Sequence, residues 1–403
     1  MQILCRFEAK RRDAAAAKQL LVRRQLTPHE RKMSCRGDGI EGLYSVYWHN
    51  DLHHVDEVLV MADMNKSEMQ MTARALVAPG KGILAADESL PTIEKRFKAI
   101  QVAATEENRR AYREMLFTAP GLGAYISGVI LFDETLRQRG TDGTSFVEIL
   151  GKQKIIPGIK VDKGTKALAG FPEDNITEGL DGLRERFAEY AKLGARFSKW
   201  RAVINVGPNI PGRTCLESNA EALGRFAALS QEAGLVPIVE PEVLMEGEHT
   251  IERHFEVTDG ALENVFNALR RHKVQFEAML LKPNMVLPGK SSPQQVNNEE
   301  IAHATLTCML RNVPAAVPGI VFLSGGQSDV QATERLDAMN KRGKAPWELG
   351  FSYGRALQAP ALAAWRGKPE NVSAAQAALL HRARCNGAAR SGSYGPELEK
   401  SPS

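Results

Sequence analysis

The sequence predicts an α/β protein built as one (β/α)8, or TIM-type, barrel domain over residues 64–386. Short apolar, β-prone runs recur from residue 80 onward, and most begin about 40 residues apart. A helix candidate lies between each run and the next, as a closed parallel barrel requires. The alternative is an open doubly wound sheet, which the absence of a GxGxxG motif after any run disfavours.

The predicted strands share one pattern, because most of them begin apolar and end in charged or small polar residues. Helices are expected between them, for example over 178–192 and 218–233, where Ser218 followed by Glu221 has the spacing of a capping box. The eight predicted strands are 82–88, 128–132, 156–162, 195–201, 236–242, 279–282, 319–324 and 349–355.

The two ends of the chain differ from the barrel in composition. Residues 1–63 begin rich in Arg, Lys and Ala and then turn acidic, which predicts a disordered extension outside the fold, with Met64 as an alternative start. An organelle transit peptide is the other interpretation, although Glu8, Asp13 and Glu30 count against it. Residues 387–403 are expected to form a flexible C-terminal tail.

Composition excludes several functional classes. A net charge of +4 from scattered Lys and Arg residues gives nucleic-acid binding little support. No apolar run approaches the roughly 18 residues of a membrane span. The five cysteines are odd in number and form no CxxC, which indicates free thiols in a reducing compartment. The predicted location is the cytoplasm, or a plastid if residues 1–63 are a transit peptide.

Lys282 is the most informative single residue, because it lies in the apolar run 278–286. Pro283 cannot continue a central ladder, so the strand should end there with the amine at its C-terminal tip. Burial disfavours the charged form of a lysine, and a neutral amine is a nucleophile toward carbonyl carbon. The alternative is a lysine that extends from a strand end into solvent.

Charged pairs at the ends of other strands point to the same face of the predicted barrel. Residues two apart on a strand share a face, so Glu240 and Glu242 lie together with Pro241 turned away. Each pair alone suits a solvated strand end, but their recurrence at the C-terminal ends favours an active site. The further pairs are Lys199 with Arg201, and Asp87 with Ser89.

An anion site is predicted after the last two strands. Ser324, Gly325 and Gly326 follow an apolar strand, and a Gly-Gly turn exposes backbone N–H groups as an anion nest. The next strand ends at Gly354 and Arg355, where a guanidinium can bind phosphate through two hydrogen bonds. Phosphate sites in such barrels favour the loops after strands 7 and 8.

These residues resemble the class I, Schiff-base type of fructose-bisphosphate aldolase, from residue 71 to residue 386. The motifs that carry the resemblance occur in the order in which the family has them. They are 80–89, 159–164, 199–201, 236–242, 280–286, 322–328 and 351–357.

The resemblance implies roles for individual residues. Lys282 matches the imine-forming lysine and Glu240 the main general acid/base, and the surrounding catalytic residues are Asp87, Lys199, Glu242 and Arg201. The phosphate nearest the ketone would be bound by Ser324, Gly325, Gly326, Gly354 and Arg355. The other phosphate would be bound by Ser89, Thr92, Lys95, Arg96 and Lys163.

The implied reaction is the reversible cleavage of fructose 1,6-bisphosphate to dihydroxyacetone phosphate and glyceraldehyde 3-phosphate. The resemblance implies sugar phosphates as ligands, no metal or other cofactor, and a homotetramer. It leaves open whether Glu240 or Asp87 takes the C4 hydroxyl proton. It also leaves open the preference among fructose 1,6-bisphosphate, fructose 1-phosphate and sedoheptulose 1,7-bisphosphate. The terminal tyrosine common in the family is missing, and Tyr394 is not terminal, so slower proton exchange at C3 or a substitute proton donor is expected.

Three other functional classes can be compared with the sequence. A metal-dependent aldolase needs histidines at strand ends, and none of the predicted strands ends in one. Another Schiff-base lyase, such as a transaldolase, would share the lysine but not the paired phosphate sites. A scaffold or binding role without catalysis would not need every catalytic position to be filled.

Overall fold

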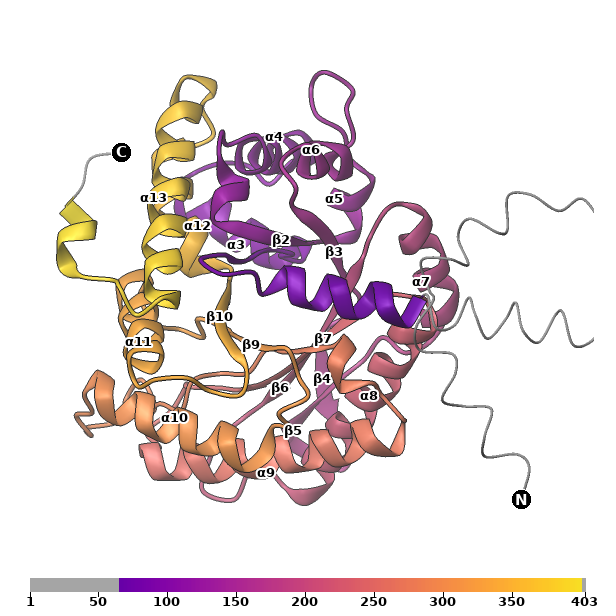
Figure 1. Ribbon diagram of the computed structural model, residues 1–403, viewed down its shortest axis with the longest axis vertical. Coiled ribbons are helices and arrows are strands. Elements are labelled where there is room, and N and C mark those ends of the chain that lie inside the picture. The colour runs from indigo at the N-terminus through magenta and orange to yellow at the C-terminus, as the bar shows by residue number, and fades with distance from the viewer. Residues whose placement is uncertain (1–64, 401–403) are drawn as a thin grey trace, which may run out of the picture. The chain divides into compact units, whose positions relative to one another are not determined.

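The computed structural model describes residues 65–400, so the expectations for residues 1–63 and Met64 lie outside the described residues. Eight parallel strands close into a barrel in the order β1-β10-β9-β8-β7-β6-β3-β2, and helices surround it (Figure 1). The ring closes where β1 pairs with β10, with Ile83 opposite Ser352. The predicted (β/α)8 barrel is therefore confirmed.

The barrel strands coincide with the eight predicted apolar runs, shifted by a few residues at their ends. They are β1 Gly82–Ala86, β2 Ile126–Leu131, β3 Ile156–Lys160, β6 Phe197–Ile204, β7 Val236–Val243, β8 Leu280–Leu281, β9 Gly319–Phe322 and β10 Glu348–Tyr353.

Most of the helices connect successive barrel strands, the last two follow the final strand, and they pack on the outside of the barrel. They are α3 Leu90–Ala99, α4 Glu106–Phe117, α5 Asp133–Arg137, α6 Phe146–Lys152, α7 Leu183–Lys192, α8 Arg213–Glu232, α9 Ile251–Arg271, α10 Asn298–Asn312, α11 Asp329–Lys341, α12 Arg355–Trp365 and α13 Val372–Arg390. None of the helices between residues 65 and 400 is both long enough and apolar enough to cross a membrane.

Strand alternation divides the core into an inner and an outer layer. On β6, Phe197 packs inside the barrel with Ile83 and Ile238, together with the side of a helix over residues 65–76. Trp200 points outward instead, and its ring centroid lies 5.8 Å from that of Phe226 on α8. This is the alternation that places charged residues of the same strands inside the barrel mouth.

Glycines on two neighbouring strands make room for the inner aromatic ring. A Cβ atom on Gly158 of β3 would lie 2.3 Å from the ring of Phe197. One on Gly128 of β2 would lie 2.6 Å from Leu76. The bottom of the barrel is therefore filled by large side chains that require glycine opposite them.

Two local predictions were wrong. Residues 165–177 form an antiparallel hairpin, β4 Thr165–Leu168 and β5 Phe171–Thr177, which the sequence did not indicate. The predicted capping box at Ser218 is absent because α8 begins at Arg213, with Gly212 at its N-cap, so Ser218 lies inside the helix.

The C-terminal segment does not separate from the barrel at residue 386. Helix α13 continues to Arg390, which donates to the carbonyl oxygens of Ala78 and Lys81 at 2.5 Å each. Beyond the helix, Tyr394 is buried, and its N–H donates to Asp337. In the segment for which a flexible tail was predicted, Arg390 and Tyr394 are therefore packed against the barrel.

The cysteines that the structure describes are Cys215, Cys308 and Cys385, and all three are buried free thiols. This agrees with the expectation for these three positions.

Candidate active site

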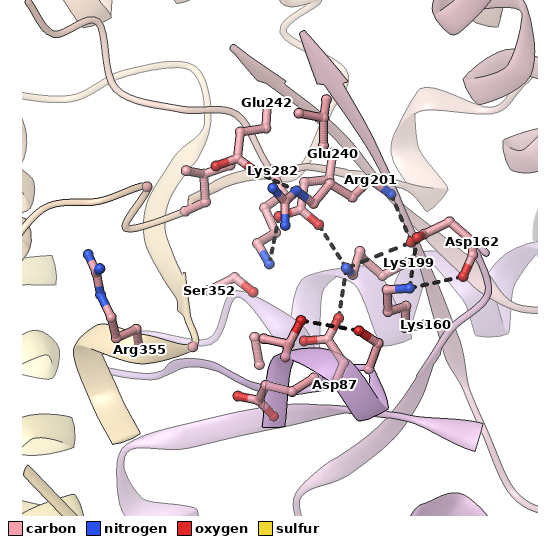
Figure 2. A pocket seen from close by; sticks show the side chains of 18 of the residues that line it. Asp87, Lys160, Asp162, Lys199, Arg201, Glu240, Glu242, Lys282, Ser352 and Arg355 are labelled. Atoms are coloured by element: carbon pink, nitrogen blue, oxygen red, sulfur yellow. Dashed lines mark hydrogen bonds and ion pairs between the residues drawn. The ribbon is translucent and has the colours of Figure 1, made fainter. Parts of the chain in front are cut away.

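The C-terminal ends of the barrel strands surround a cavity of about 410 Å³ (Figure 2). All six predicted catalytic residues line it: Asp87, Lys199, Arg201, Glu240, Glu242 and Lys282. Most of the predicted phosphate-binding residues line it as well: Ser89, Thr92, Arg96, Ser324, Gly325, Gly326, Gly354 and Arg355. Lys95 and Lys163 are exposed and are not among the lining residues.

Lys282 is held at the tip of β8, as its sequence context predicts. The strand ends at Leu281, and the Lys282 N–H donates to Val239 O at 2.8 Å on the neighbouring strand β7. Pro283 has no N–H to extend the ladder. The side chain enters the barrel mouth, where the residue is only 4% exposed, and its Nζ lies 3.0 Å from Glu240 Oε1.

Glu240 lies between two ammonium groups. Its Oε1 contacts Lys282, and its Oε2 lies 3.1 Å from Lys199 Nζ. Lys199 Nζ in turn lies 2.7 Å from Asp87 Oδ2. Four strand ends, those of β1, β6, β7 and β8, thus place two cations and two carboxylates in one continuous network of ion pairs (Figure 2).

Each charged group in this network stabilises the ionised form of its neighbours. Burial alone would raise the pKa of Asp87 and of Glu240, but Lys199 and Lys282 outweigh burial and lower both pKa values. Burial would lower the pKa of Lys199, but Asp87 and Glu240 raise it by more. At neutral pH, Asp87 and Glu240 are therefore carboxylates that can accept protons, and Lys199 is a cation.

Glu242 behaves differently from Glu240. Its Oε2 lies 2.5 Å from Arg201 Nε, yet burial raises the pKa of Glu242 by more than Arg201 lowers it. Two glutamates that are two residues apart on β7 thus have pKa values shifted in opposite directions. Such a separation lets neighbouring carboxyl groups serve as proton acceptor and proton donor in one site.

Two charged residues of the site, Lys160 and Asp162, were not predicted from the sequence. Lys160 Nζ lies 2.7 Å from Asp162 Oδ1, and both line the cavity. Asp162 Oδ2 also accepts from the Arg201 N–H at 3.2 Å. Their spacing could have identified them, because they lie two residues apart at the end of the predicted strand 156–162.

One end of the cavity is a backbone turn suited to an anion. It lies between β9 and α11, with Gly325 at φ +37° and Gly326 at φ +81°, a left-handed conformation that glycine adopts without strain. Arg355, the first residue of α12, donates from Nη2 to Gln327 O at 2.8 Å. That bond ties the arginine to the turn.

The other end of the cavity lies at the start of α3, where Ser89 and Thr92 place their hydroxyl groups 3.1 Å apart. Arg96, one turn further along the helix, forms an ion pair with Glu88, which also pairs with the buried Arg113. A cation is therefore fixed at this end by a buried network. Glu88 was not predicted, because its partners are distant in sequence.

Tyr394 does not take part in the cavity. Its hydroxyl group donates to Glu399 at 2.7 Å, and Tyr394 is not among the lining residues.

Comparisons with known proteins agree with this geometry. The family model described as class-I fructose-bisphosphate aldolase, of the glycolytic type, matches residues 68–403. A probable fructose-bisphosphate aldolase class 1 of Xanthomonas campestris is 54% identical over 332 residues, covering 82% of this chain and 99% of the relative. A chloroplastic fructose-bisphosphate aldolase of Oryza sativa is 51% identical, covering 84% and 86%.

A solved structure is similar over the same region. It is the fructose-bisphosphate aldolase of Plasmodium falciparum in complex with TRAP and a small-molecule inhibitor, with a TM-score of 0.81 and 47% identity. The match covers 82% of this chain and 96% of that one. With the family model matching most of the chain, the protein belongs to the class I fructose-bisphosphate aldolase family.

Proposed function

We propose that this chain cleaves fructose 1,6-bisphosphate reversibly to dihydroxyacetone phosphate and glyceraldehyde 3-phosphate, through an imine on Lys282. The observation that carries the proposal is the buried Lys282 amine, 3.0 Å from Glu240, in a cavity that is also lined by the turn at Gly325 and Gly326 and by Ser89, Thr92 and Arg96. Each phosphate of an open-chain sugar bisphosphate has a partner there, and the ketone between them reaches Lys282.

Imine formation needs proton movements that the network of ion pairs can supply. The carboxylate of Glu240 takes a proton from Lys282, and the free amine adds to the C2 ketone. The developing oxyanion is stabilised by the nearby ammonium group of Lys199. Protonation of the C2 hydroxyl releases water and leaves a protonated imine, which is an electron sink.

Cleavage requires a base at the C4 hydroxyl group. Glu240 and Asp87 both contact Lys199, and both are ionised, so each is chemically able to take that proton. The C3–C4 bond then breaks, its electron pair forms the enamine, and glyceraldehyde 3-phosphate leaves. Protonation at C3 and hydrolysis of the imine release dihydroxyacetone phosphate and restore the amine.

Borohydride trapping tests the proposal directly. Incubation with dihydroxyacetone phosphate and borohydride should add the reduced three-carbon phosphate to Lys282, as peptide mass mapping would show. Lys282→Met should form no adduct, while Lys344→Met, which changes an exposed lysine, should react like the parent. Absence of the adduct, or its presence on another lysine, would refute the assignment.

Metal-independent catalysis is part of the same proposal. No histidine lines the cavity within the described residues. Activity should therefore persist after dialysis against a chelator. Loss of activity that added divalent metal restores would favour a metal-dependent route instead.

The assembly and location follow from the family resemblance. We propose a homotetramer, which light scattering coupled to size exclusion would distinguish from smaller species. We also propose a cytoplasmic location, with a plastid as the alternative; relatives of both kinds exist, in Arabidopsis thaliana and Oryza sativa. Imaging of the full chain fused to a fluorescent protein at its C-terminus separates the two.

A further inference from the structure

Lys290 lies against the anion-binding turn but outside the group of residues assigned to it. A Cβ atom added to Gly326 would lie 2.6 Å from Lys290 Cε and 2.8 Å from Lys290 Nζ. The ammonium group therefore packs directly on the glycine whose left-handed backbone shapes the turn. Lys290 is not one of the six predicted catalytic residues, so the proposed reaction steps give this cation no role.

Backbone hydrogen bonds on Gly289 and Lys290 anchor the main chain from which the Lys290 side chain extends. The loops after β7 and β8 pair through Gly289 N–H to His249 O and Lys290 N–H to Met245 O, each 2.8 Å. The approach is so close that a Cβ on Gly289 would lie 2.2 Å from Gly247 O. The Lys290 side chain thus extends from a hydrogen-bonded loop that lies directly beside the turn.

Glu246 holds the ammonium group in the free protein. Lys290 Nζ donates to Glu246 Oε1 at 2.8 Å. Burial would raise the pKa of Glu246, but the hydrogen bond and charge of Lys290 lower it, so the glutamate is ionised. Both side chains are more than 40% exposed, so this ion pair is weak and readily exchanged for another partner.

We propose that Lys290 is an additional binding residue for the phosphate held by the turn at residues 324–328, and that Glu246 restrains it when the site is empty. A phosphate dianion at the turn carries more charge than a carboxylate, and it competes with Glu246 for the same ammonium group. The inference rests on the proposed function, since it concerns the phosphate nearest the ketone.

The two members of the pair have opposite expected effects. Lys290→Met should raise the inhibition constant of inorganic phosphate and the KM for fructose 1,6-bisphosphate about three- to tenfold, with kcat nearly unchanged. Glu246→Gln frees the ammonium group and should lower both constants about two- to threefold. In the double variant, the effect of Glu246→Gln should disappear.

A merely structural ion pair predicts another pattern. If the pair only joins the two loops, both single variants should shift the constants in the same direction, and that result would overturn the inference. Glu248→Gln changes the same charge in the same exposed loop and controls for general electrostatics. Lys344→Met serves likewise for the lost cation. Equal effects of Glu246→Gln and Glu248→Gln would also count against it.

Two further measurements locate the effect. Fructose 1-phosphate keeps only the phosphate nearest the ketone, so Lys290→Met should raise its KM by a similar factor. The difference from the parent should shrink between low salt and about 0.5 M salt, because exposed charges are screened. Borohydride labelling of Lys282 must persist in every variant. If the parent itself forms no adduct, the proposed function fails, whereas persistent labelling with same-direction shifts refutes only the role of Lys290.

Discussion

Lys199 connects more acidic groups than any other cation in the active site. Its Nζ lies 2.7 Å from Asp87, 3.1 Å from Glu240 and 4.0 Å from Asp162. It therefore offsets three carboxylates, and in the proposed reaction it supplies the positive charge that stabilises the oxyanion on C2 of the substrate.

Replacing Lys199 by Met should reduce kcat/KM by about 10²–10⁴-fold, because charge stabilisation and a proton relay are lost together. Single-turnover trapping should show slowed imine formation on Lys282. Lys344→Met provides the matched change at an exposed site. A variant that lost only substrate affinity, with imine formation at the parental rate, would contradict this role.

Asp87 should make stability depend on pH. Its pKa is below the ordinary value of 3.8 in the folded protein, so the unfolded chain binds a proton more readily. The carboxylate consequently stabilises the fold above that value, and the contribution is lost as pH falls toward the folded pKa. The urea midpoint of the parent relative to Asp87→Asn should be constant from pH 7 to pH 5 and converge below about pH 4. A gap that widens on acidification would be inconsistent with this sign.

Much of the site could be predicted at the level of single residues because strands alternate. The i, i+2 rule placed Lys199 with Arg201, and Glu240 with Glu242, inside the barrel. The same rule applies to Lys160 and Asp162, which lie in the motif at residues 159–164 but were not predicted to act in the site. Glu88 could not be found this way, since its hydrogen bond to Gln358 joins residues 270 apart in sequence.

At the scale of elements, helix starts were the least predictable feature. Helix α10 begins with a capping box in which Asn297 accepts from the Glu300 N–H at 2.9 Å. Ser218 has the matching sequence pattern but lies inside α8, where the backbone N–H groups are already paired. A short spacing rule cannot detect a helix that started five residues earlier.

This difference can be measured as stability. Asn297→Ala should lower the free energy of unfolding by about 1 kcal/mol, because a cap is lost. Ser218→Ala, the control, should change it by less than about 0.5 kcal/mol, since alanine favours a helix interior. Urea denaturation with unchanged m-values would establish both numbers. Equal losses in the two variants would mean that Ser218 acts as a cap after all.

The barrel strands were predictable because each is a short, buried, apolar run. The hairpin β4–β5 was not, because most of its residues are exposed and several are charged, such as Lys166 and Glu173. Its strands pair only with each other, and the buried residues of β5, Asp174 and Thr177, are polar, so the hairpin has no apolar pattern.

At the scale of the whole molecule, the C-terminal segment is held by a buried cation. Arg382 has a side chain only 3% exposed, and its Nη1 lies 2.5 Å from Glu399 Oε1. Tyr394 donates to the same carboxylate. The composition of this segment indicated a flexible tail, because the segment is polar and short. Composition cannot predict its ion pair with Arg382 on α13.

Glu399→Gln should lower the free energy of unfolding by roughly 1–2 kcal/mol, because a buried guanidinium loses its charged partner. Glu397→Gln, an exposed change two residues away, should leave it nearly unchanged. Differential scanning calorimetry on both variants provides the comparison. Increased proteolysis confined to residues after Arg390 in Glu399→Gln would show that the segment is released locally. Identical melting profiles would mean that this ion pair contributes nothing.

The seam between β1 and β10 also determines when the protein can fold during synthesis. Ile83 pairs with Ser352, and Arg390 bonds to Ala78, Lys81 and Glu348, so the first barrel strand is completed by the strand that is translated after all the others. While the ribosome still covers β10, β1 has an unpaired edge that can join other chains. The barrel therefore closes only after β10 has left the exit tunnel.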